Sequence, residues 1–360
     1  GDFVARIGGD EFVVAVSSLA DEKDLVALAR TIIEQMRRPL PFEDTYCRCG
    51  VSIGVAVAGL ARREGDFAKG LLIDADIALY RAKRNGRDRF EFFSNELRSE
   101  IVRTKKLSDA ILSGLENGEF FPVFQPQFDA KSLDIIGVEA LVRWEHPIDG
   151  LLAPGVFLSI AEELNVAKLI DRTMLEQALF QLTRWAAAGI DIPKVSVNVS
   201  ASRLRDADLM DSLADLPIRP GSVSFELLES IFLDENDDGI VRNAERLRAM
   251  GVNLEIDDFG TGYASISSLI HLRPARLKID RGLVAPMVES SRERQLVAAI
   301  IEIGRSLGIE TVAEGVETFE HVALLRKLGC NALQGFALAP PMRSDELIEF
   351  VRREGWRKAA

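Results

Sequence analysis

The chain has 360 residues, of which 47% are hydrophobic and 28% are charged, so it can form a sizeable core and is long enough for two domains. Its 56 acidic residues outnumber its 44 lysines and arginines, and the net charge of −12 argues against a nucleic-acid polymer as a partner. No apolar run reaches the roughly 18–20 residues of a membrane span, no signal peptide is visible, and three cysteines without metal-site spacing indicate a reducing, cytoplasmic protein.

Residues 1–93 have the pattern of a small α/β unit. Two apolar runs surround the Gly-Gly-Asp-Glu sequence at 8–11, which predicts a β-hairpin because Gly-Gly and Gly-Asp favour primed turns. Cys47 and Cys49 share one face of an alternating pattern and are expected to be reduced core thiols. The other expected elements are helices at 25–36 and 71–84 and strands at 49–58 and 89–93. The unit has too few strands to be complete and the chain begins without Met, so we expect an upstream part to be missing.

Residues 94–118 differ from the unit before them. Ser94 is the predicted start of a helix, and apolar residues recur at helical spacing from Leu97 to Leu115. We therefore predict a connecting helix over 94–118 rather than a flexible linker.

Residues 119–360 alternate between strand and helix patterns. The eight strand candidates are 122–127, 135–143, 195–199, 223–228, 252–257, 275–279, 309–313 and 331–338. Amphipathic segments expected to be helical are 157–188, 239–250, 292–307, 319–328 and 345–353, the last with Ser344 as its N-cap. Alternation of this kind predicts a parallel sheet, and eight repeats predict its closure. The predicted fold class is α/β, a (β/α)8 TIM-like barrel preceded by a partial α+β domain.

Polar side chains follow nearly all of these strands, at the end where such barrels carry their active sites. They are Glu139, Asn198, Glu226, Asp257, Asp258, Lys278, Glu314 and Gln334. Most offer hard oxygen atoms, which favour Mg²⁺ or Mn²⁺ over zinc. Each position alone has a structural interpretation as a loop, turn or helix-cap residue, but so many successive strand ends favour a site.

The sequence predicts a metal site with oxygen ligands from Glu139, Asn198, Glu226 and Asp257. Asp257 and Asp258 are adjacent, and at a strand end both carboxylates can turn toward the barrel mouth. Two like charges so close are costly unless cations lie between them, so we expect Asp257 to bridge two metals. The alternatives are a turn-forming Asp258 and an Asn198 that caps the next helix.

Other polar residues at this end have more than one interpretation. Lys278 could orient or polarise a metal-bound water, or it could pair with Asp280. Glu314 could hold the second metal or the attacking water, and Gln334 could bind a ligand or that water. Two residues suit a phosphate or a base edge, namely Gln125 and Arg143. For the arginine, a surface ion pair is the alternative.

These residues fall in a series of short motifs whose order and spacing are specific. The motifs are Glu139-Ala140-Leu141 with Arg143-Trp144, Asn198-Val199-Ser200, Phe225-Glu226-Leu227-Leu228-Glu229-Ser230, Asp257-Asp258-Phe259-Gly260-Thr261-Gly262-Tyr263, Leu277-Lys278-Ile279-Asp280, Ala313-Glu314-Gly315-Val316-Glu317 and Gln334-Gly335-Phe336. Over residues 107–345 the chain resembles the EAL-domain family of cyclic-di-GMP phosphodiesterases. It departs from the family at Phe124 and Phe336, where tyrosine is usual, and at Ala264, where serine is usual. None of these changes removes a metal ligand.

The resemblance implies an enzyme that hydrolyses cyclic di-GMP to linear pGpG with two Mg²⁺ or Mn²⁺ ions. It implies catalytic roles for Glu139, Lys278 and Glu314. It implies metal ligation by Glu139, Asn198, Glu226, Asp257, Asp258 and Glu314. Substrate contacts are implied for Gln125, Arg143, Asp280 and Gln334. Glu229 would anchor the loop after Asp258, and a homodimer would form through the loop 259–269.

Residues 1–93 resemble the C-terminal half of a GGDEF domain, the diguanylate cyclase family. The resemblance lies in the motifs at 6–12, 76–83 and 85–87. It implies nucleotide contacts by Gly8, Gly9, Asp10, Glu11, Lys83 and Arg87. The family's first metal aspartate and its guanine contacts lie upstream of this chain, so we expect no cyclic di-GMP synthesis by it.

Two alternatives stay open at this point. The barrel could be a catalytically silent receptor for cyclic di-GMP, although receptors of this family usually lose a metal ligand. The parent protein could also be bifunctional, with a GGDEF domain that makes cyclic di-GMP or binds GTP and tunes the phosphodiesterase. An upstream sensor domain is expected in that parent.

Overall fold

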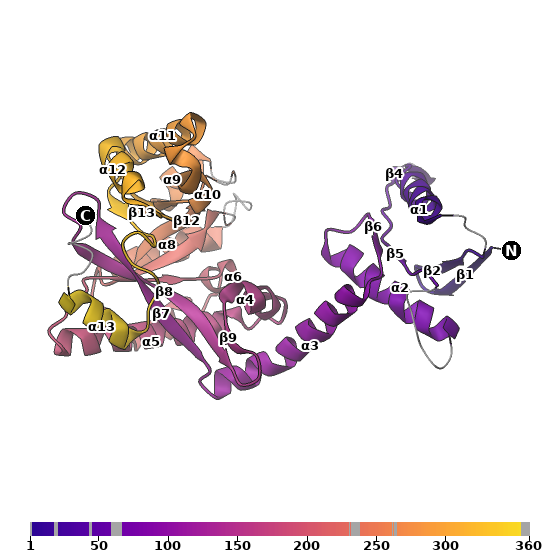
Figure 1. Cartoon of the computed structure of the whole chain (residues 1–360), viewed down its shortest axis with the longest axis horizontal. Helices are drawn as coiled ribbons and strands as arrows, with labels where there is room; N and C mark the ends of the chain where they lie inside the picture. Colours follow the sequence, from indigo (N-terminus) through magenta and orange to yellow (C-terminus); the bar gives the residue numbers. More distant parts are fainter. Residues whose placement is uncertain are drawn as a thin grey trace. The chain divides into compact units, whose positions relative to one another are not determined.

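The computed structural model describes residues 2–17, 21–42, 45–58, 67–229, 231, 238–260, 262 and 265–353. The chain divides into two compact units, Gly1–Leu107 and Ser108–Ala360 (Figure 1). Helix α3 (Asn95–Glu116) runs across this division. Its start is capped by the Ser94 hydroxyl, which accepts a hydrogen bond from the Leu97 backbone N–H at 3.2 Å. None of the described helices is both long and apolar enough to cross a membrane.

The described part of the first unit contains small sheets, helices α1 and α2, and the beginning of α3. Its elements are β1 (Phe3–Gly8), β2 (Glu11–Ala15), α1 (Glu22–Met36), β3 (Leu40–Phe42), β4 (Thr45–Cys47), β5 (Ile53–Val55), α2 (Phe67–Arg84) and β6 (Phe90–Phe92). The predicted hairpin is present, because β1 and β2 pair antiparallel around Gly9, whose φ of 50° favours glycine. The strand predicted over 49–58 is shorter and covers only Ile53–Val55.

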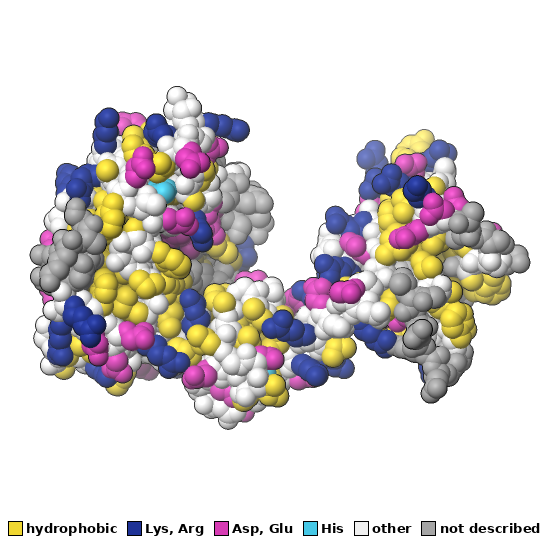
Figure 2. All heavy atoms as spheres, in the orientation of Figure 1, with side chains coloured by type: hydrophobic (Ala, Val, Ile, Leu, Met, Phe, Trp, Pro, Cys, Tyr) yellow, Lys and Arg dark blue, Asp and Glu magenta, His cyan; other side chains and the backbone are white. Residues whose placement is uncertain are grey.

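Several apolar side chains lie at the surface of the first unit. Phe3, Phe12 and Tyr46 have exposed fractions of 60%, 63% and 74%, and Figure 2 shows hydrophobic side chains at this surface. Cys47 and Cys49 are also exposed, so the prediction of two core thiols is wrong. The physical reason is that β4, which ends at Cys47, pairs with β3 alone among the described strands, and both strands are exposed.

The second unit is a closed eight-stranded barrel, as predicted. Its strands follow the order β10-β11-β12-β13-β14-β15-β7-β8, and β8 pairs with β10 to close the circle. They are β7 (Phe120–Asp129), β8 (Ile135–His146), β10 (Val195–Asn198), β11 (Val223–Leu228), β12 (Asn253–Phe259), β13 (Arg276–Ile279), β14 (Glu310–Ala313) and β15 (Ala332–Leu333). A short extra strand, β9 (Gly150–Leu152), pairs with the end of β8.

One strand of the barrel runs opposite to the others. β7 is antiparallel to both of its neighbours, β8 and β15, so the prediction of a wholly parallel sheet is wrong at this strand. Only residues 130–134 connect β7 to β8, whereas a parallel crossover needs about a dozen residues or more. The Asp129 carboxylate fixes this tight turn by accepting hydrogen bonds from the backbone N–H groups of Lys131 at 2.9 Å and Ser132 at 2.7 Å.

Helices follow most strands of the barrel. They are α4 (Pro154–Glu163), α5 (Ala167–Ala187), α6 (Ala201–Leu204), α7 (Leu209–Ala214), α8 (Asp238–Ala249), α9 (Ile266–Leu272), α10 (Arg281–Val284), the 3₁₀ helix η2 (Ala285–Val288), α11 (Ser291–Leu307), α12 (Phe319–Leu328) and α13 (Ser344–Arg353). The single segment predicted over 157–188 is two helices, separated near Asn165 in the left-handed conformation (φ 58°). Ser344 lies inside α13 rather than before it, and its hydroxyl donates to the Gln181 side chain and accepts from the Trp185 indole.

The helices lie around the outside of the barrel (Figure 1). Helix α5 contacts β7 and β10, α8 contacts β12, and α11 contacts β13 and β14. A representative contact is the edge-on packing of Phe124 in β7 against Trp185 in α5, with ring centroids 4.7 Å apart and both side chains buried. The apolar core therefore lies between strands and helices, and the inward faces of the strands are free to carry polar groups.

Candidate active site

The barrel interior carries polar side chains in two successive layers. Residues two apart in a strand share a face, and five strands have polar residues at two such positions. These pairs are Gln125 with Gln127, Ser196 with Asn198, Ser224 with Glu226, Glu255 with Asp257, and Arg276 with Lys278. In β7, which runs in the opposite direction, the first residue of the pair lies level with Glu139. The layer nearer the carboxyl ends of the parallel strands holds most of the predicted site residues.

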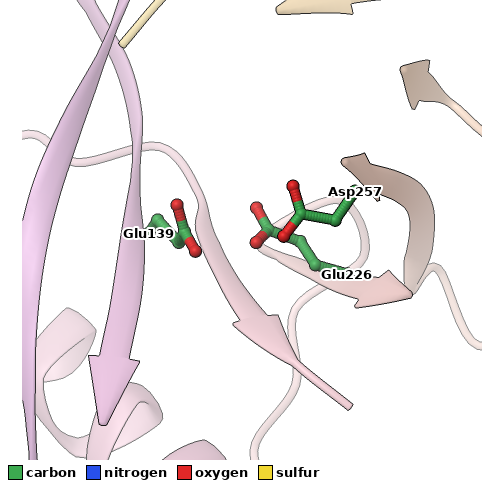
Figure 3. Close-up of side chains that lie close together, drawn as sticks. All are labelled: Glu139, Glu226 and Asp257. Carbon is green, nitrogen blue, oxygen red and sulfur yellow. The ribbon is translucent and has the colours of Figure 1, made fainter. Parts of the chain in front are cut away.

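Five carboxylates surround one ammonium group in that layer. We call this set the acidic cluster; its members are Glu139, Glu226, Asp257, Asp258, Glu314 and Lys278. Carboxylate oxygens of Glu139, Glu226 and Asp257 lie within 4.8 Å of one another, and so do those of Asp257, Asp258 and Glu314. Figure 3 shows the first three side chains pointing toward one another from separate strands. Asp257 belongs to both groups, which is the arrangement that a residue bridging two metals requires.

Lys278 lies at the centre of the acidic cluster and is fully buried. Its Nζ lies within ion-pair distance of four carboxylates: Glu314 at 2.6 Å, Glu226 at 2.8 Å, Asp257 at 3.0 Å and Glu139 at 3.2 Å. Asp280, the alternative partner of the lysine, instead caps α10 by accepting a hydrogen bond from the Gly282 N–H at 2.9 Å. The ammonium group is thus the main positive charge within the cluster.

A local backbone irregularity brings two adjacent aspartates to the same site. The pairing of β12 with β13 shifts between Ile256 and Phe259, and Asp258 adopts a left-handed φ of 54°. Neighbouring residues in a regular strand point to opposite faces, whereas a bulge can re-aim one of them. Here the bulge allows Asp258 to join Asp257 and Glu314, at the cost of backbone strain in a non-glycine residue.

The loop that follows these aspartates is held by Glu229. One oxygen of its carboxylate accepts hydrogen bonds from the backbone N–H groups of Gly260 at 3.1 Å and Gly262 at 3.3 Å. These are the contacts that a loop-anchoring role requires. Ala264, which also belongs to this loop, lies outside the described residues.

The buried carboxylates of the acidic cluster have opposite pKa shifts. Burial raises the pKa of Glu226 well above its usual value, and the neighbouring charge of Glu139 adds to this shift. Burial would also raise the pKa of Glu139, but Lys278 and several hydrogen bonds outweigh it and lower the pKa. Like charges forced together divide in this way because only some of them can stay ionised without a compensating cation.

The remaining members of the cluster show the same excess of negative charge. Burial and the charge of Asp257 raise the pKa of Asp258 to about 6. Burial also raises the pKa of Glu314 to about 8, against the opposing effect of Lys278. For Lys278, burial opposes the charged form, but the surrounding carboxylates raise its pKa well above the usual value. The lysine is therefore protonated at neutral pH.

Two amide side chains donate to Glu139, and a third accepts from one of them. Asn198 Nδ2 donates to Glu139 Oε1 at 2.9 Å, and Gln334 Nε2 donates to Glu139 Oε2 at 2.6 Å. Gln334 Nε2 also donates to Gln125 Oε1 at 3.1 Å. The backbone next to Gln334 passes close to Val316, and glycine at 335 permits this because a Cβ there would lie 2.3 Å from the Val316 backbone. Amide assignments follow from the hydrogen-bond network, and this network orients Glu139.

A cleft of about 440 Å³ opens above the acidic cluster. Its floor includes Glu139, Glu226, Asp257 and Glu314. The apolar residues of its lining, which we call the apolar wall, include Leu141, Leu158, Met174, Val199 and Phe336. The rim carries an ion pair between Arg281 and Glu317 at 2.7 Å. This volume is within the usual range of ligand sites, roughly 300–1,000 Å³, and combines an apolar wall with a charged floor.

Not every predicted contact residue faces this cleft. Gln125 and Gln334 line it, while Arg143 and Asp280 are not among the described residues that do. Arg143 is half-buried, and its guanidinium group donates to the Val142 carbonyl at 2.8 Å. The roles of these four residues as substrate contacts stay predictions.

The nucleotide-contacting residues predicted in the first unit lie at its surface. Gly8, Gly9, Asp10 and Glu11 form the exposed turn of the hairpin, where the Arg6 guanidinium donates to the Gly9 carbonyl. Lys83 and Arg87 are exposed near the end of α2. Their contacts with a nucleotide also stay predictions.

Sequence reasoning missed a buried aspartate beside the cleft. Asp171 of α5 accepts hydrogen bonds from Ser200 through the backbone N–H at 3.0 Å and the hydroxyl at 2.7 Å, so it holds the segment that follows Asn198. Burial raises the pKa of Asp171 to about 6. An acidic residue on the apolar stripe of a predicted helix is the signal that could have identified it.

Sequence reasoning also missed the lower polar layer of the barrel, which is the layer farther from the carboxyl ends of the parallel strands. Lys194 pairs with Glu255, and Arg276 pairs with Glu310 at 2.8 Å. Ser196 donates to Glu255 at 3.4 Å. The available signal was the polar residue two positions before each of Asn198, Glu226, Asp257 and Lys278, because residues two apart in a strand share a face.

Comparisons with known proteins find a family match for each of the two units of the chain. The family model of the EAL domain matches residues 105–341, and that of the diguanylate cyclase GGDEF domain matches residues 1–89. The bifunctional diguanylate cyclase/cyclic di-GMP phosphodiesterase MucR of Pseudomonas aeruginosa is 36% identical over 97% of this chain and 51% of its own length. The cyclic di-GMP phosphodiesterase PdeR of Escherichia coli is 32% identical over 97% of this chain and 52% of its own length. The chain thus spans about half the length of the curated relatives it matches.

Solved structures give the same comparison in three dimensions. The PaMucR phosphodiesterase in complex with c-di-GMP is 39% identical, with a TM-score of 0.63, over 67% of this chain and 99% of that one. The EAL enzyme Bd1971, bound to cAMP and cyclic-di-GMP, is 26% identical, with a TM-score of 0.66, over 80% of this chain and 76% of that one.

Proposed function

The chain belongs to the EAL-domain family, with part of a GGDEF domain before the barrel, and on this premise we propose that it hydrolyses cyclic di-GMP to linear pGpG. The observation that carries the proposal is the acidic cluster, in which five buried or half-buried carboxylates face a single lysine beneath a cleft. The named activities of MucR and PdeR support the choice of substrate.

The residues of the acidic cluster fit two divalent cations. Five carboxylates against one ammonium leave a formal charge of −4 when all are ionised, which two divalent ions would neutralise. Glu226 Oε1 is buried and has no hydrogen-bond partner among the described residues, which is the state of an atom that awaits a cation. Carboxylate and amide oxygens favour Mg²⁺ or Mn²⁺.

We assign the ligands from the two carboxylate groups. Glu139, Glu226 and Asp257 would hold one cation, and Asp257, Asp258 and Glu314 would hold the other. Asn198 would join the first group by turning its amide, whose Nδ2 donates to Glu139 in this structure, so that its oxygen faces the cation. Bound there, the cations would polarise the phosphoryl oxygens and activate water for in-line attack.

The chain's own residues would orient the reacting groups. Lys278 keeps its proton and lies beneath the cleft, which it does not line among the described residues, so it would act by holding Glu314, 2.6 Å away, in the orientation that aligns water or a phosphoryl oxygen. Gln334 would hold one oxygen of Glu139 in place through its Nε2. The apolar wall would receive a guanine base, and the exposed ring of Phe336 keeps the aromatic face that tyrosine offers elsewhere in the family.

The full chain, incubated with cyclic di-GMP and Mg²⁺ or Mn²⁺, should give pGpG on chromatography of the nucleotides, and a chelator should stop the reaction. Glu139→Ala should abolish turnover while the far-UV circular dichroism spectrum stays that of the folded protein. Retained activity in this variant would contradict the assignment. Tight binding without product would identify a receptor, and no binding would refute the proposed cleft.

The wider predictions for the parent protein need separate tests. GTP binding by a longer protein with the complete GGDEF domain would test the bifunctional alternative, which the description of MucR supports. Size-exclusion chromatography with light scattering would test the homodimer. The upstream sensor domain and the cytoplasmic location stay predictions.

A further inference from the structure

Hydrogen bonds between buried glutamine side chains connect the lower layer of the barrel to Glu139. Gln334 is the central residue: Nε2 donates to Glu139 and Gln125, and Oε1 accepts from Gln127 Nε2 at 3.0 Å. Gln127 is fully buried, and its own oxygen faces Arg276 Nη1 at 3.5 Å, the long limit of a hydrogen bond. Gln127 does not touch the cleft, yet a single side chain separates it from a predicted metal ligand.

Groups that can only donate or only accept hydrogen bonds determine the orientation of each of these three glutamine amides. A backbone carbonyl can only accept, so Gln125 must direct its Nε2 to Ala339 O, at 3.1 Å. A guanidinium can only donate, so Gln127 must direct its oxygen to Arg276. A carboxylate at Glu139 can only accept, which requires the Gln334 amino group. Reversal of one amide would therefore place oxygen against oxygen or donor against donor.

We infer that Gln127 is a positioning residue for the proposed metal site, because it fixes the orientation in which Gln334 donates to Glu139. The inference rests on the proposed function. Without the Gln127 donor, Gln334 Oε1 either stays buried without a partner or turns toward the Glu139 carboxylate. Either outcome loosens Glu139, although Gln127 contacts neither the proposed metals nor the substrate.

The test measures binding of Mn²⁺ alone to the full chain, from the electron paramagnetic resonance signal of the free ion, together with thermal unfolding. Gln127→Met removes the donor at similar volume, and we expect about tenfold weaker Mn²⁺ binding, as for other residues that orient metal ligands. Gln177→Met is the matched control. Gln177 also bonds β7, by donating to the Phe120 carbonyl at 2.9 Å, but no hydrogen bond among the described residues links it to Glu139. It should change stability and leave Mn²⁺ binding unchanged.

A double-variant cycle separates positioning from a general structural role. If Gln127 acts through Gln334, then Gln127→Met should weaken Mn²⁺ binding no further once Gln334→Met is present. Additive losses would overturn the inference. Should Gln127→Met fail to fold, Gln127→Glu keeps the pairing with Arg276 and forces Gln334 to turn, so it should weaken binding more than tenfold.

The remaining outcomes distinguish the two proposals. A wild-type chain that binds no Mn²⁺ would refute the proposed function. A wild-type chain that binds Mn²⁺ while the folded Gln127 variants bind it equally well would refute only the inference.

Discussion

The two polar layers of the barrel lie on the same strands, two residues apart, but differ in their balance of charge. One contains ion pairs, and the other contains an excess of carboxylates. In the lower layer, which we call the paired cluster, Lys194 faces Glu255 and Arg276 faces Glu310. In the acidic cluster, five carboxylates share one lysine. Glu310 is exposed, but Lys194 and Glu255 are as buried as Glu139, Glu226 and Lys278. The difference between these buried groups lies in whether each charge has its own partner.

The pKa directions record this difference. Burial would raise the pKa of Glu255, but Lys194 and Arg276 outweigh it and lower the pKa. Glu226, adjacent to Glu255 in the strand pairing, has its pKa raised well above the usual value by burial and by the charge of Glu139. Buried charges that have partners are typical of residues that stabilise the fold. Buried charges of one sign in excess are typical of a site that binds cations or does chemistry. Matched substitutions in the two layers should therefore have opposite effects.

Glu226→Gln should produce the largest effect, in the acidic cluster. It removes a proposed ligand and several kcal/mol of transition-state stabilisation, so hydrolysis of cyclic di-GMP should fall about 1000-fold or more. It also removes an unfavourable charge, so the metal-free variant should melt about 2–4 °C above the wild type. Calorimetry with chelator, and again with Mn²⁺, checks this. A variant less stable than the metal-free wild type would show that the acidic cluster is not strained by its charge.

Glu255→Gln is the same substitution in the paired cluster and should have the opposite effect on stability. It leaves the buried Lys194 without its partner, which costs about 3–5 kcal/mol of the free energy of unfolding. Urea unfolding measures the loss, and Mn²⁺ affinity of the folded fraction should change little.

The control for this pair replaces both charges. Lys194→Met with Glu255→Met removes the pair without leaving a lone charge, so the double variant should recover most of the lost stability. A double variant as unstable as Glu255→Gln would mean that the pair itself, rather than an unpaired charge, determines the fold.

Much of the barrel could be predicted from the sequence because its signals are local. Alternation gave all eight strands, and polar residues at the strand ends gave every member of the acidic cluster. The direction of β7 was also within reach, since the connection at 130–134 is too short for a crossover helix.

Other features depend on contacts that no local pattern encodes. The bulge that turns Asp258 toward Glu314 needs a positive φ at a residue other than glycine, which only the surrounding fold can impose. The guanidinium group of Arg143 donates to the carbonyl of its neighbour Val142. The spacing of residues in the sequence does not determine which rotamer a side chain adopts. Sequence therefore located the site but not the direction of each side chain in it.

Asp171 extends the comparison to a buried carboxylate with mainly neutral partners. Hydrogen bonds from Ser200 and the nearby charge of Arg203 favour the ionised form, but burial outweighs them and raises the pKa from 3.8 to about 6. The folded state therefore holds the proton more tightly than the unfolded state, and stability should fall as pH rises from about 4 to 6.5. Asp171→Asn should reduce the pH dependence by about 3 kcal/mol, and the rest should come from the acidic cluster, where the pKa values of Asp258 and Glu314 are also raised.

Thermal unfolding of the metal-free chain at pH 4.5 and pH 7 measures the effect as a difference between the two melting temperatures. The matched control is Asp215→Asn, because Asp215 is exposed and should leave the pH dependence of the wild type unchanged. If the Asp171 variant kept the full dependence, the charge cost would have to come from the acidic cluster instead. In that case neutral hydrogen bonds would compensate a buried carboxylate as well as the ion pairs of the paired cluster do.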